Sequence, residues 1–200
     1  MSKRGRPGKS APLSVSQNFL TSRRTIRRLI RIAGLKRSDH VVEIGAGRGH
    51  ITRELAQTCG RVSAYEIDPA LGGRLAAEFQ NSNVDVHCRD FLTAALPKDA
   101  PYKVFANIPF CRTSGIIRKL TAAAAPPEEA WLVVEKGAAK RFTGQPRESR
   151  VSLLLKPFFE LEIRYHFRRD DFHPAPSVDA VLLHLRRKTA PDAAASQRQV

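Results

Sequence analysis

Three closely spaced glycines, Gly45, Gly47 and Gly49, constrain the fold of this 200-residue chain more than any other feature. The apolar run before them, residues 40–44, is typical of a buried strand, and residues 51–57 have the pattern of a helix. Glycines at such a strand–turn–helix junction let a ligand approach the backbone closely. The sequence therefore predicts an α/β fold with a ligand site at this turn. The spacing G-x-G-x-G differs from the dinucleotide pattern, so a nicotinamide dehydrogenase is the weakest functional candidate.

A carboxylate ends the second predicted strand, residues 61–65, about 20 positions after the glycines. Both hydroxyls of a ribose can donate to one carboxylate, and Glu66 is the better placed candidate for that role. Asp68 precedes Pro69 and is expected to cap the following helix. The strand, the glycines and the acid together indicate a nucleoside-bearing cofactor, with Ile67 beside it.

The third predicted strand, residues 85–88, is followed by Asp90 and Phe91. Asp90 is suited to accept a hydrogen bond from the adenine amine of a cofactor, with Phe91 near the ring. An aspartate that serves only the local turn is the alternative interpretation.

An unusual set of residues follows the fourth predicted strand, residues 104–106. A planar base could stack on Phe110, while the side-chain oxygen of Asn107 accepts from an exocyclic amine. Pro109 restricts Ile108 to extended geometry, so the Ile108 carbonyl can be a second acceptor. Two acceptors on one amino group suit a reaction at that nitrogen, although a strand that simply ends in a turn fits these four residues alone equally well.

The charge of the chain is strongly positive and uneven. The sequence holds 34 Lys and Arg against 19 Asp and Glu, a formal charge of +15. Residues 1–40 contain eleven basic residues and one acidic residue. Such a concentrated basic region is the electrostatic signature of a polyanion binder. We expect residues 1–14 to be a disordered basic arm that contacts phosphates.

A basic helix is predicted after Thr21 and Ser22, with Gly34 as its end. Apolar residues recur on one stripe of this helix, and arginines occupy the rest of its surface. A solvated surface usually mixes the signs of its charges, so we interpret the arginines as contacts to nucleic acid. The RNA contacts predicted from the chain are Arg23, Arg24, Arg27, Arg28, Arg31, Arg112, Lys136, Lys140, Arg141 and Phe172.

Composition narrows the remaining possibilities. The three cysteines are widely spaced and show no metal-ligand pattern, and an odd count without a signal peptide indicates reduced thiols in a cytoplasmic protein. No stretch approaches the roughly 20 apolar residues of a membrane span. Three further strands are predicted, at 130–135, 158–167 and 180–185. We expect one catalytic domain at 15–188, a flexible tail at 189–200, and a monomer without a membrane partner.

Several motifs occur in one order that resembles a known family. They are Gln17-Asn18-Phe19-Leu20, Glu43-Ile44-Gly45-Ala46-Gly47-Arg48-Gly49-His50, Glu66-Ile67-Asp68, Asn107-Ile108-Pro109-Phe110 and Phe172-His173-Pro174-x-Pro176-x-Val178-Asp179. Together they resemble ribosomal RNA adenine-N6 methyltransferases over roughly residues 14–188. The Erm type, which modifies one adenine of bacterial 23S rRNA, is the most similar subgroup.

The resemblance implies a Rossmann-like class I methyltransferase fold, with a seven-stranded, mostly parallel sheet and an antiparallel last strand. It implies S-adenosylmethionine as methyl donor, 23S rRNA as substrate, protein-free or in a precursor large subunit, and resistance to macrolides, lincosamides and streptogramin B. Gln17, Asn18 and Leu20 match the segment that flanks the methionine part of the cofactor. The three glycines match the loop beneath it, Glu66 the ribose acid, Asp90 the adenine acceptor, and Asn107 to Phe110 the catalytic motif.

Three departures from the family pattern qualify this expectation. Ala106 stands where glycine is usual, and Phe110 where tyrosine is commoner. Erm-type proteins also usually carry a further helical domain, whereas about a dozen residues follow Lys188 here. Competing functions are a non-catalytic RNA-binding protein of the same fold, a small-subunit rRNA dimethyladenosine transferase, and a methyltransferase for a small molecule or protein.

Overall fold

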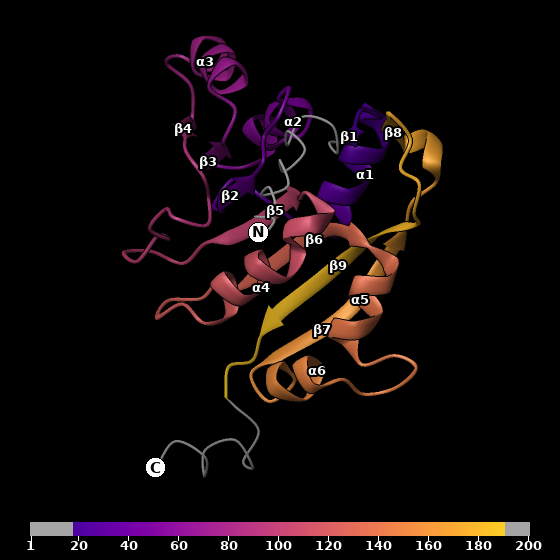
Figure 1. Cartoon of the computed structure of the whole chain (residues 1–200). Helices are drawn as coiled ribbons and strands as arrows, with labels where there is room; N and C mark the ends of the chain where they lie inside the picture. The colour runs from indigo at the N-terminus through magenta and orange to yellow at the C-terminus, as the bar shows by residue number, and fades with distance from the viewer. Residues whose placement is uncertain (1–17, 191–200) are drawn as a thin grey trace, which may run out of the picture.

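A computed structural model of the chain describes residues 18–190 (Figure 1). Its helices are α1 (Arg23–Ile32), α2 (His50–Thr58), α3 (Pro69–Glu78), α4 (Thr113–Thr121), α5 (Lys136–Thr143) and α6 (Arg150–Leu155). Its strands are β1 (Phe19–Leu20), β2 (His40–Ile44), β3 (Arg61–Glu66), β4 (Val84–Cys88), β5 (Lys103–Asn107), β6 (Glu129–Glu135), β7 (Phe159–His166), β8 (Phe172–His173) and β9 (Ala180–Arg187). The predicted arm at 1–14, Gln17 and all but the first two residues of the predicted tail lie outside the described residues.

Seven strands form one sheet in the order β4-β3-β2-β5-β6-β9-β7. The strands from β4 to β6 pair in parallel, and β9 runs antiparallel to both β6 and β7. This confirms the predicted seven-stranded, mostly parallel sheet with an antiparallel last strand. The order reverses beside β2, so the carboxyl ends of β2 and β5 flank the crevice where ligands bind in open α/β sheets.

Neighbouring residues along each strand pack into two different cores, as the alternation of strand side chains requires. Val41 belongs to the core that contains residues of α1, α2 and α3, whereas Val42 belongs to the core under α4 and α5. Figure 1 shows α4, α5 and α6 grouped on one side of the sheet. The two cores hold the sheet rigid, so its carboxyl edge is a fixed platform for the site.

A second, two-stranded sheet joins distant parts of the chain. Strand β1 pairs antiparallel with β8, with Leu20 opposite Phe172 and Phe19 opposite His173. Both Leu20 and Phe172 are buried, at 2% and 4% exposure. The pairing places the residues just before α1 at the carboxyl edge of the large sheet. Two-residue strands have no hydrophobic period, so the sequence did not predict this sheet.

Helix α1 begins as predicted, because the Ser22 side chain accepts from the Thr25 backbone N–H. Its predicted apolar stripe is buried at Ile26, Leu29 and Ile30. Helix α6 was not predicted, and it begins at Arg150 after a cap at Ser149. No helix within residues 18–190 is long and apolar enough to cross a membrane.

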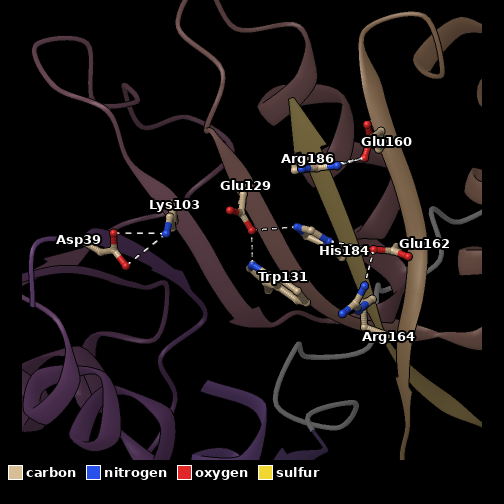
Figure 2. Close-up of polar contacts among 9 residues, drawn as sticks. All are labelled: Asp39, Lys103, Glu129, Trp131, Glu160, Glu162, Arg164, His184 and Arg186. Carbon is tan, nitrogen blue, oxygen red and sulfur yellow. Dashed lines mark hydrogen bonds and ion pairs between the residues drawn. The ribbon is translucent and has the colours of Figure 1, made fainter. Parts of the chain in front are cut away.

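A polar cluster spans the opposite end of the sheet, on β6, β9 and β7 (Figure 2). His184 lies between Glu129, whose Oε2 is 2.9 Å from Nε2, and Glu162, whose Oε1 is 3.5 Å from Nδ1. The imidazole stacks on Trp131 with ring centroids 3.7 Å apart, and the indole N–H donates to Glu129. Arg164 in turn donates to Glu162. These groups satisfy one another across the strands, and we refer to them as the β6–β9–β7 cluster.

Candidate functional site

The side-chain amide of Asn107 is held in one orientation at the end of β5. Its Nδ2 donates to the backbone carbonyl of Asn18 at 2.7 Å. A carbonyl only accepts, so this contact assigns the nitrogen, and Oδ1 is left as an acceptor without a partner among residues 18–190. Sequence reasoning placed Asn18 near the cofactor and missed this contact, which depends on the pairing of β1 with β8.

The turn after Asn107 is closed by its own hydrogen bonds. Pro109 has φ −60°, and its carbonyl accepts from the Arg112 N–H at 2.9 Å. The carbonyl of Phe110 accepts from Thr113 Oγ1 at 2.9 Å. No hydrogen bond within residues 18–190 occupies the carbonyl of Ile108, whose side chain is buried in the core. Two acceptors, Asn107 Oδ1 and the Ile108 carbonyl, are therefore available at this strand end.

Two adjoining cavities meet at the carboxyl edge of the sheet. The first is lined by Asn18, Phe19, Gly45, Gly47, Asn107, Ile108, Pro109 and Phe110. The second is lined by Ile44, Gly45, Tyr65, Ile67, Arg89, Asp90, Phe91, Leu92, Pro109, Arg112 and Ile116. Both cavities share Gly45 and Pro109, so they adjoin at the glycine loop. The structure thus assembles most of the predicted cofactor and catalytic residues around one crevice.

The three glycines of the loop have different surroundings, although all have positive φ. A side chain at Gly45 would meet nothing closer than 3.9 Å, so this glycine opens the crevice. At Gly47 a Cβ would lie 2.8 Å from the ring of Phe19, and at Gly49 it would lie 2.7 Å from Leu75. Gly45 and Gly47 therefore line the ligand cavity, whereas Gly49 packs α2 against α3 and supports it from behind. Leu20 likewise supports the site from the core.

Two buried carboxyl groups lie beneath the loop. Glu66, 1% exposed, accepts from the backbone N–H of Gly47 at 2.7 Å and of Asp68 at 2.9 Å. Glu43 is also 1% exposed, and its Oε2 has no hydrogen-bond partner in the described chain. Burial raises the pKa of Glu43 to about 8, and the nearby charge of Glu66 adds to the rise. Glu66 thus fixes the glycine loop through both of its carboxylate oxygens.

Asp90 serves its own turn and also lines the second cavity. Its Oδ1 accepts from the Leu92 N–H at 2.8 Å, and Phe91 is buried beside it. The predicted RNA contact Arg112 is half-buried on the wall of the same cavity. Asp68 caps α3 as predicted, accepting from the N–H groups of Ala70 and Leu71.

The arginines of α1 are less uniform in their surroundings than the sequence suggested. Arg23 and Arg27 both pair with Glu54 of α2, at 2.5 and 2.6 Å, yet their side chains remain 64% and 51% exposed. Burial raises the pKa of Glu54, but hydrogen bonds from Arg27 and Arg23 outweigh burial, so the pKa is lowered. Arg28 lies over the ring of Tyr165. The other predicted contacts Arg24, Arg31, Lys140 and Arg141 are exposed, and Lys136 lies 3.6 Å from Asp179.

The prediction that Phe172 presents its ring to the RNA is wrong. The ring is 4% exposed and packs in the core against Phe167, at a centroid distance of 5.2 Å. Two prolines, Pro174 and Pro176, follow Phe172 closely, and such a sequence is typical of an exposed loop. The pairing of Phe172 with Leu20 across the small sheet instead makes it structural.

Comparison with known proteins identifies the family. The family model of ribosomal RNA adenine dimethylases matches residues 9–198. This chain belongs to that dimethylase family. Its resemblance to rRNA adenine-N6 methyltransferases, inferred from the motifs, is thereby confirmed.

The dimethylase relatives extend beyond the length of this chain. An rRNA adenine N-6-methyltransferase of Limosilactobacillus reuteri is 37% identical over 174 residues, which are 86% of this chain and 70% of the relative. One from Saccharopolyspora erythraea is 37% identical over 88% of this chain and 46% of the relative. The crystal structure of the 23S rRNA methyltransferase ErmE matches with a TM-score of 0.82 and 37% identity, over 90% of this chain and 75% of that one. A dimethyladenosine transferase from Plasmodium falciparum matches with a TM-score of 0.74 and 28% identity, over 84% of this chain and 63% of that one.

Proposed function

We propose that this chain transfers a methyl group from S-adenosylmethionine to N6 of an adenine in 23S rRNA. The orientation of Asn107 carries the proposal, because its bond to the Asn18 carbonyl leaves Oδ1 as an acceptor on the wall of the first cavity. The free Ile108 carbonyl beside it supplies the second acceptor. An amino group with two hydrogens is the substrate group that fits this pair.

The adenine amine needs such help because its lone pair is delocalised into the ring. When Asn107 Oδ1 and the Ile108 carbonyl accept the two N6 hydrogens, the nitrogen is drawn toward tetrahedral geometry and its lone pair becomes available. Phe110 stacks on the base and fixes its plane. S-adenosylmethionine would supply an electrophilic methyl group bound to a positively charged sulfur. When the methyl group is transferred to N6, the sulfur keeps the bonding electrons and the rest of the cofactor leaves as a neutral thioether. Positioning and electrostatics account for the catalysis, since the alkylated nitrogen can lose its proton to water afterwards.

The residues of the crevice fit this cofactor. The open space above Gly45 admits a ligand close to the backbone. In this proposal Glu66 would receive the ribose hydroxyls and Asp90 the adenine amine. Asp90, Ile67 and Phe91 line the second cavity. Asn18, at the junction of β1 and the first cavity, fits the methionine part. The target adenine must then be unstacked from the RNA to reach Asn107.

The choice of 23S rRNA is supported by the greater similarity to ErmE than to the dimethyladenosine transferase, at 37% against 28% identity. The exposed arginines of α1 and the basic residues of α5 would hold the RNA by its phosphates. Resistance to macrolides, lincosamides and streptogramin B is the phenotype that this modification would produce.

The decisive experiment incubates the chain with labelled S-adenosylmethionine and, separately, protein-free 23S and 16S rRNA. We expect label in 23S rRNA only, and primer extension should stop at one adenine. Label only in 16S rRNA would favour the small-subunit transferase instead. RNA binding without label in any RNA would favour a non-catalytic binding protein, and label in protein or small molecules alone would refute an RNA substrate.

A further inference from the structure

A basic cavity lies between α2 and α3, beside the crevice and separate from the predicted RNA contacts. It has a volume of about 270 Å³ and is lined by Gly47, Arg48, Arg53, Leu71, Arg74, Leu75 and Glu78. Gly47 also lines the first strand-end cavity, so the two are neighbours. Three guanidinium groups thus converge next to the site where the methyl transfer is proposed.

The positive charge of this cavity exceeds its negative charge. Arg53 is engaged by Glu78, with Nη2 2.7 Å from Oε2. Arg48 and Arg74 are exposed, and neither has a carboxylate partner within the part of the chain that the structure describes. Arg48 instead lies over the ring of Phe19, 5.3 Å from its centroid. Within residues 18–190, Arg48 and Arg74 therefore have no counter-charge.

The packing of the glycine loop creates this concentration of charge. Without a side chain at Gly49, Leu75 of α3 approaches to within 2.7 Å of the Cβ position, and the Arg53 guanidinium lies 3.6 Å from it. The excess charge also acts on His50 at the start of α2. Burial lowers the pKa of His50, and the charges of Arg53 and Arg48 lower it further. An anion in the cavity would relieve this repulsion.

We propose that Arg48 and Arg74, with Arg53 between α2 and α3, form a phosphate-binding subsite for the backbone of the substrate RNA. The inference rests on the proposed function, because it takes RNA as the substrate. Guanidinium groups match the geometry of phosphate oxygens, and unpaired arginines bind them without first breaking an ion pair. The subsite lies on the α2–α3 side of the crevice, whereas Lys140 and Arg141 lie on α5. The RNA backbone would therefore be bound by basic residues on both sides of the flipped adenine.

The test measures binding to a 23S rRNA fragment, without methyl transfer, for Arg48→Ala, Arg74→Ala and the double variant at several salt concentrations. The matched control is Arg61→Ala, because Arg61 is an exposed arginine paired with Asp85 at the amino end of β3, the opposite edge of the sheet. We expect the double variant to bind RNA about tenfold more weakly than the wild type. Its plot of log binding constant against log salt concentration should be shallower, by roughly 0.7 to 0.9 for each phosphate contact that is lost. The control should bind like the wild type.

Glu78→Gln should change the RNA affinity in the opposite direction. Removing this carboxylate frees Arg53, so the variant should bind the RNA more tightly than the wild type. The affinity for S-adenosylmethionine, measured by calorimetry, should stay unchanged in every variant.

Wild-type RNA affinity and salt slope in the double variant would overturn the subsite. Loss of S-adenosylmethionine affinity alone would assign the cavity to the cofactor and also overturn it. A wild-type chain that binds 23S rRNA without methylating it would contradict the proposed function while leaving the subsite supported by its own binding data.

Discussion

The crevice at the strand ends and the β6–β9–β7 cluster are both rich in polar side chains, yet they differ in how those side chains are satisfied. In the cluster, Glu129 accepts from His184 and Trp131, and Arg186 pairs with Glu160 across the neighbouring strand (Figure 2). In the crevice, Asn107 Oδ1 and the Ile108 carbonyl have no partner among residues 18–190. Beneath the glycine loop, buried Glu43 has an oxygen without a hydrogen-bond partner in the described part of the chain.

This difference follows from position in the sheet. Glu162 lies directly opposite His184, and Glu129 lies opposite Arg186, two residues further along β9, so both carboxylates meet the histidine across a pair of strands. Asn107 and Glu66 are the last residues of β5 and β3, where the chain leaves the sheet for a loop. Polar groups at strand ends are left for loops or for a ligand, and a cluster that closes on itself serves stability.

The largest difference between the crevice and the cluster is expected in the rate of methyl transfer, when the Asn107 acceptor is removed. Asn107→Ala is expected to lower the rate of methyl transfer to rRNA about 100- to 1,000-fold, or about 2.7–4 kcal/mol of barrier, by analogy with loss of one oriented hydrogen-bonding group. Single-turnover transfer of labelled methyl measures the effect. The matched variant in the cluster, Glu162→Gln, should transfer methyl at the wild-type rate. Equal rates for Asn107→Ala and the wild type would eliminate the proposed role of the amide.

The unpaired carboxyl of the crevice predicts a pH dependence. Because the pKa of Glu43 is raised to about 8, the folded state retains a proton that the unfolded state releases near pH 4.5. This contribution to stability is complete below pH 4.5 and is lost as the pH rises toward 8, at up to about 1.4 kcal/mol per pH unit. Denaturant unfolding between pH 5.5 and 8 should show the free energy of unfolding falling for the wild type and falling less for Glu43→Gln. Parallel curves would contradict the prediction.

Two glycines offer a matched comparison between the crevice and the surface. Gly47→Ala places a Cβ 2.8 Å from Phe19 at φ +57°, and should cost about 2 kcal/mol of stability and weaken S-adenosylmethionine binding. Gly73→Ala, in α3 with open space around it, should stabilise the chain by roughly 0.5–1 kcal/mol. Chemical denaturation and calorimetry measure both effects. A Gly47→Ala variant as stable as the wild type would show that the loop can move away from Phe19.

The smallest loss of stability is expected in the cluster. Glu129→Ala removes the acceptor for His184 and Trp131, and should lower the free energy of unfolding by about 1 kcal/mol or somewhat more. Methyl transfer per folded molecule should stay at the wild-type level. A loss of activity larger than the loss of folded protein would place the cluster in the catalytic machinery.

Much of this arrangement could be predicted from the sequence. Apolar runs located the parallel strands β2, β3, β4, β5 and β6 to within one or two residues, because buried parallel strands are rich in apolar residues. The alternating pattern of residues 158–167 located the antiparallel strand β7. Glu66 and Asn107 were found because they follow those runs. Phe172 was misplaced because its burial depends on Leu20, a residue far away in the chain. The cavity of Arg48, Arg53 and Arg74 was missed for a similar reason, since only the packing of α2 on α3 brings these arginines together.

The bond between Asn107 and the Asn18 carbonyl makes the reactive centre sensitive to a remote part of the chain. Strand β1 stays in place because β8 pairs with it and because Asp171 accepts from both Thr21 and Thr25. A substitution that weakens the β1–β8 pairing or the hydrogen bonds of Asp171 would let the Asn107 amide rotate, although no residue of the crevice itself is changed. Mutational screens for altered base selectivity or slower turnover should therefore include residues 169–173, which inspection of the reactive centre alone would leave out.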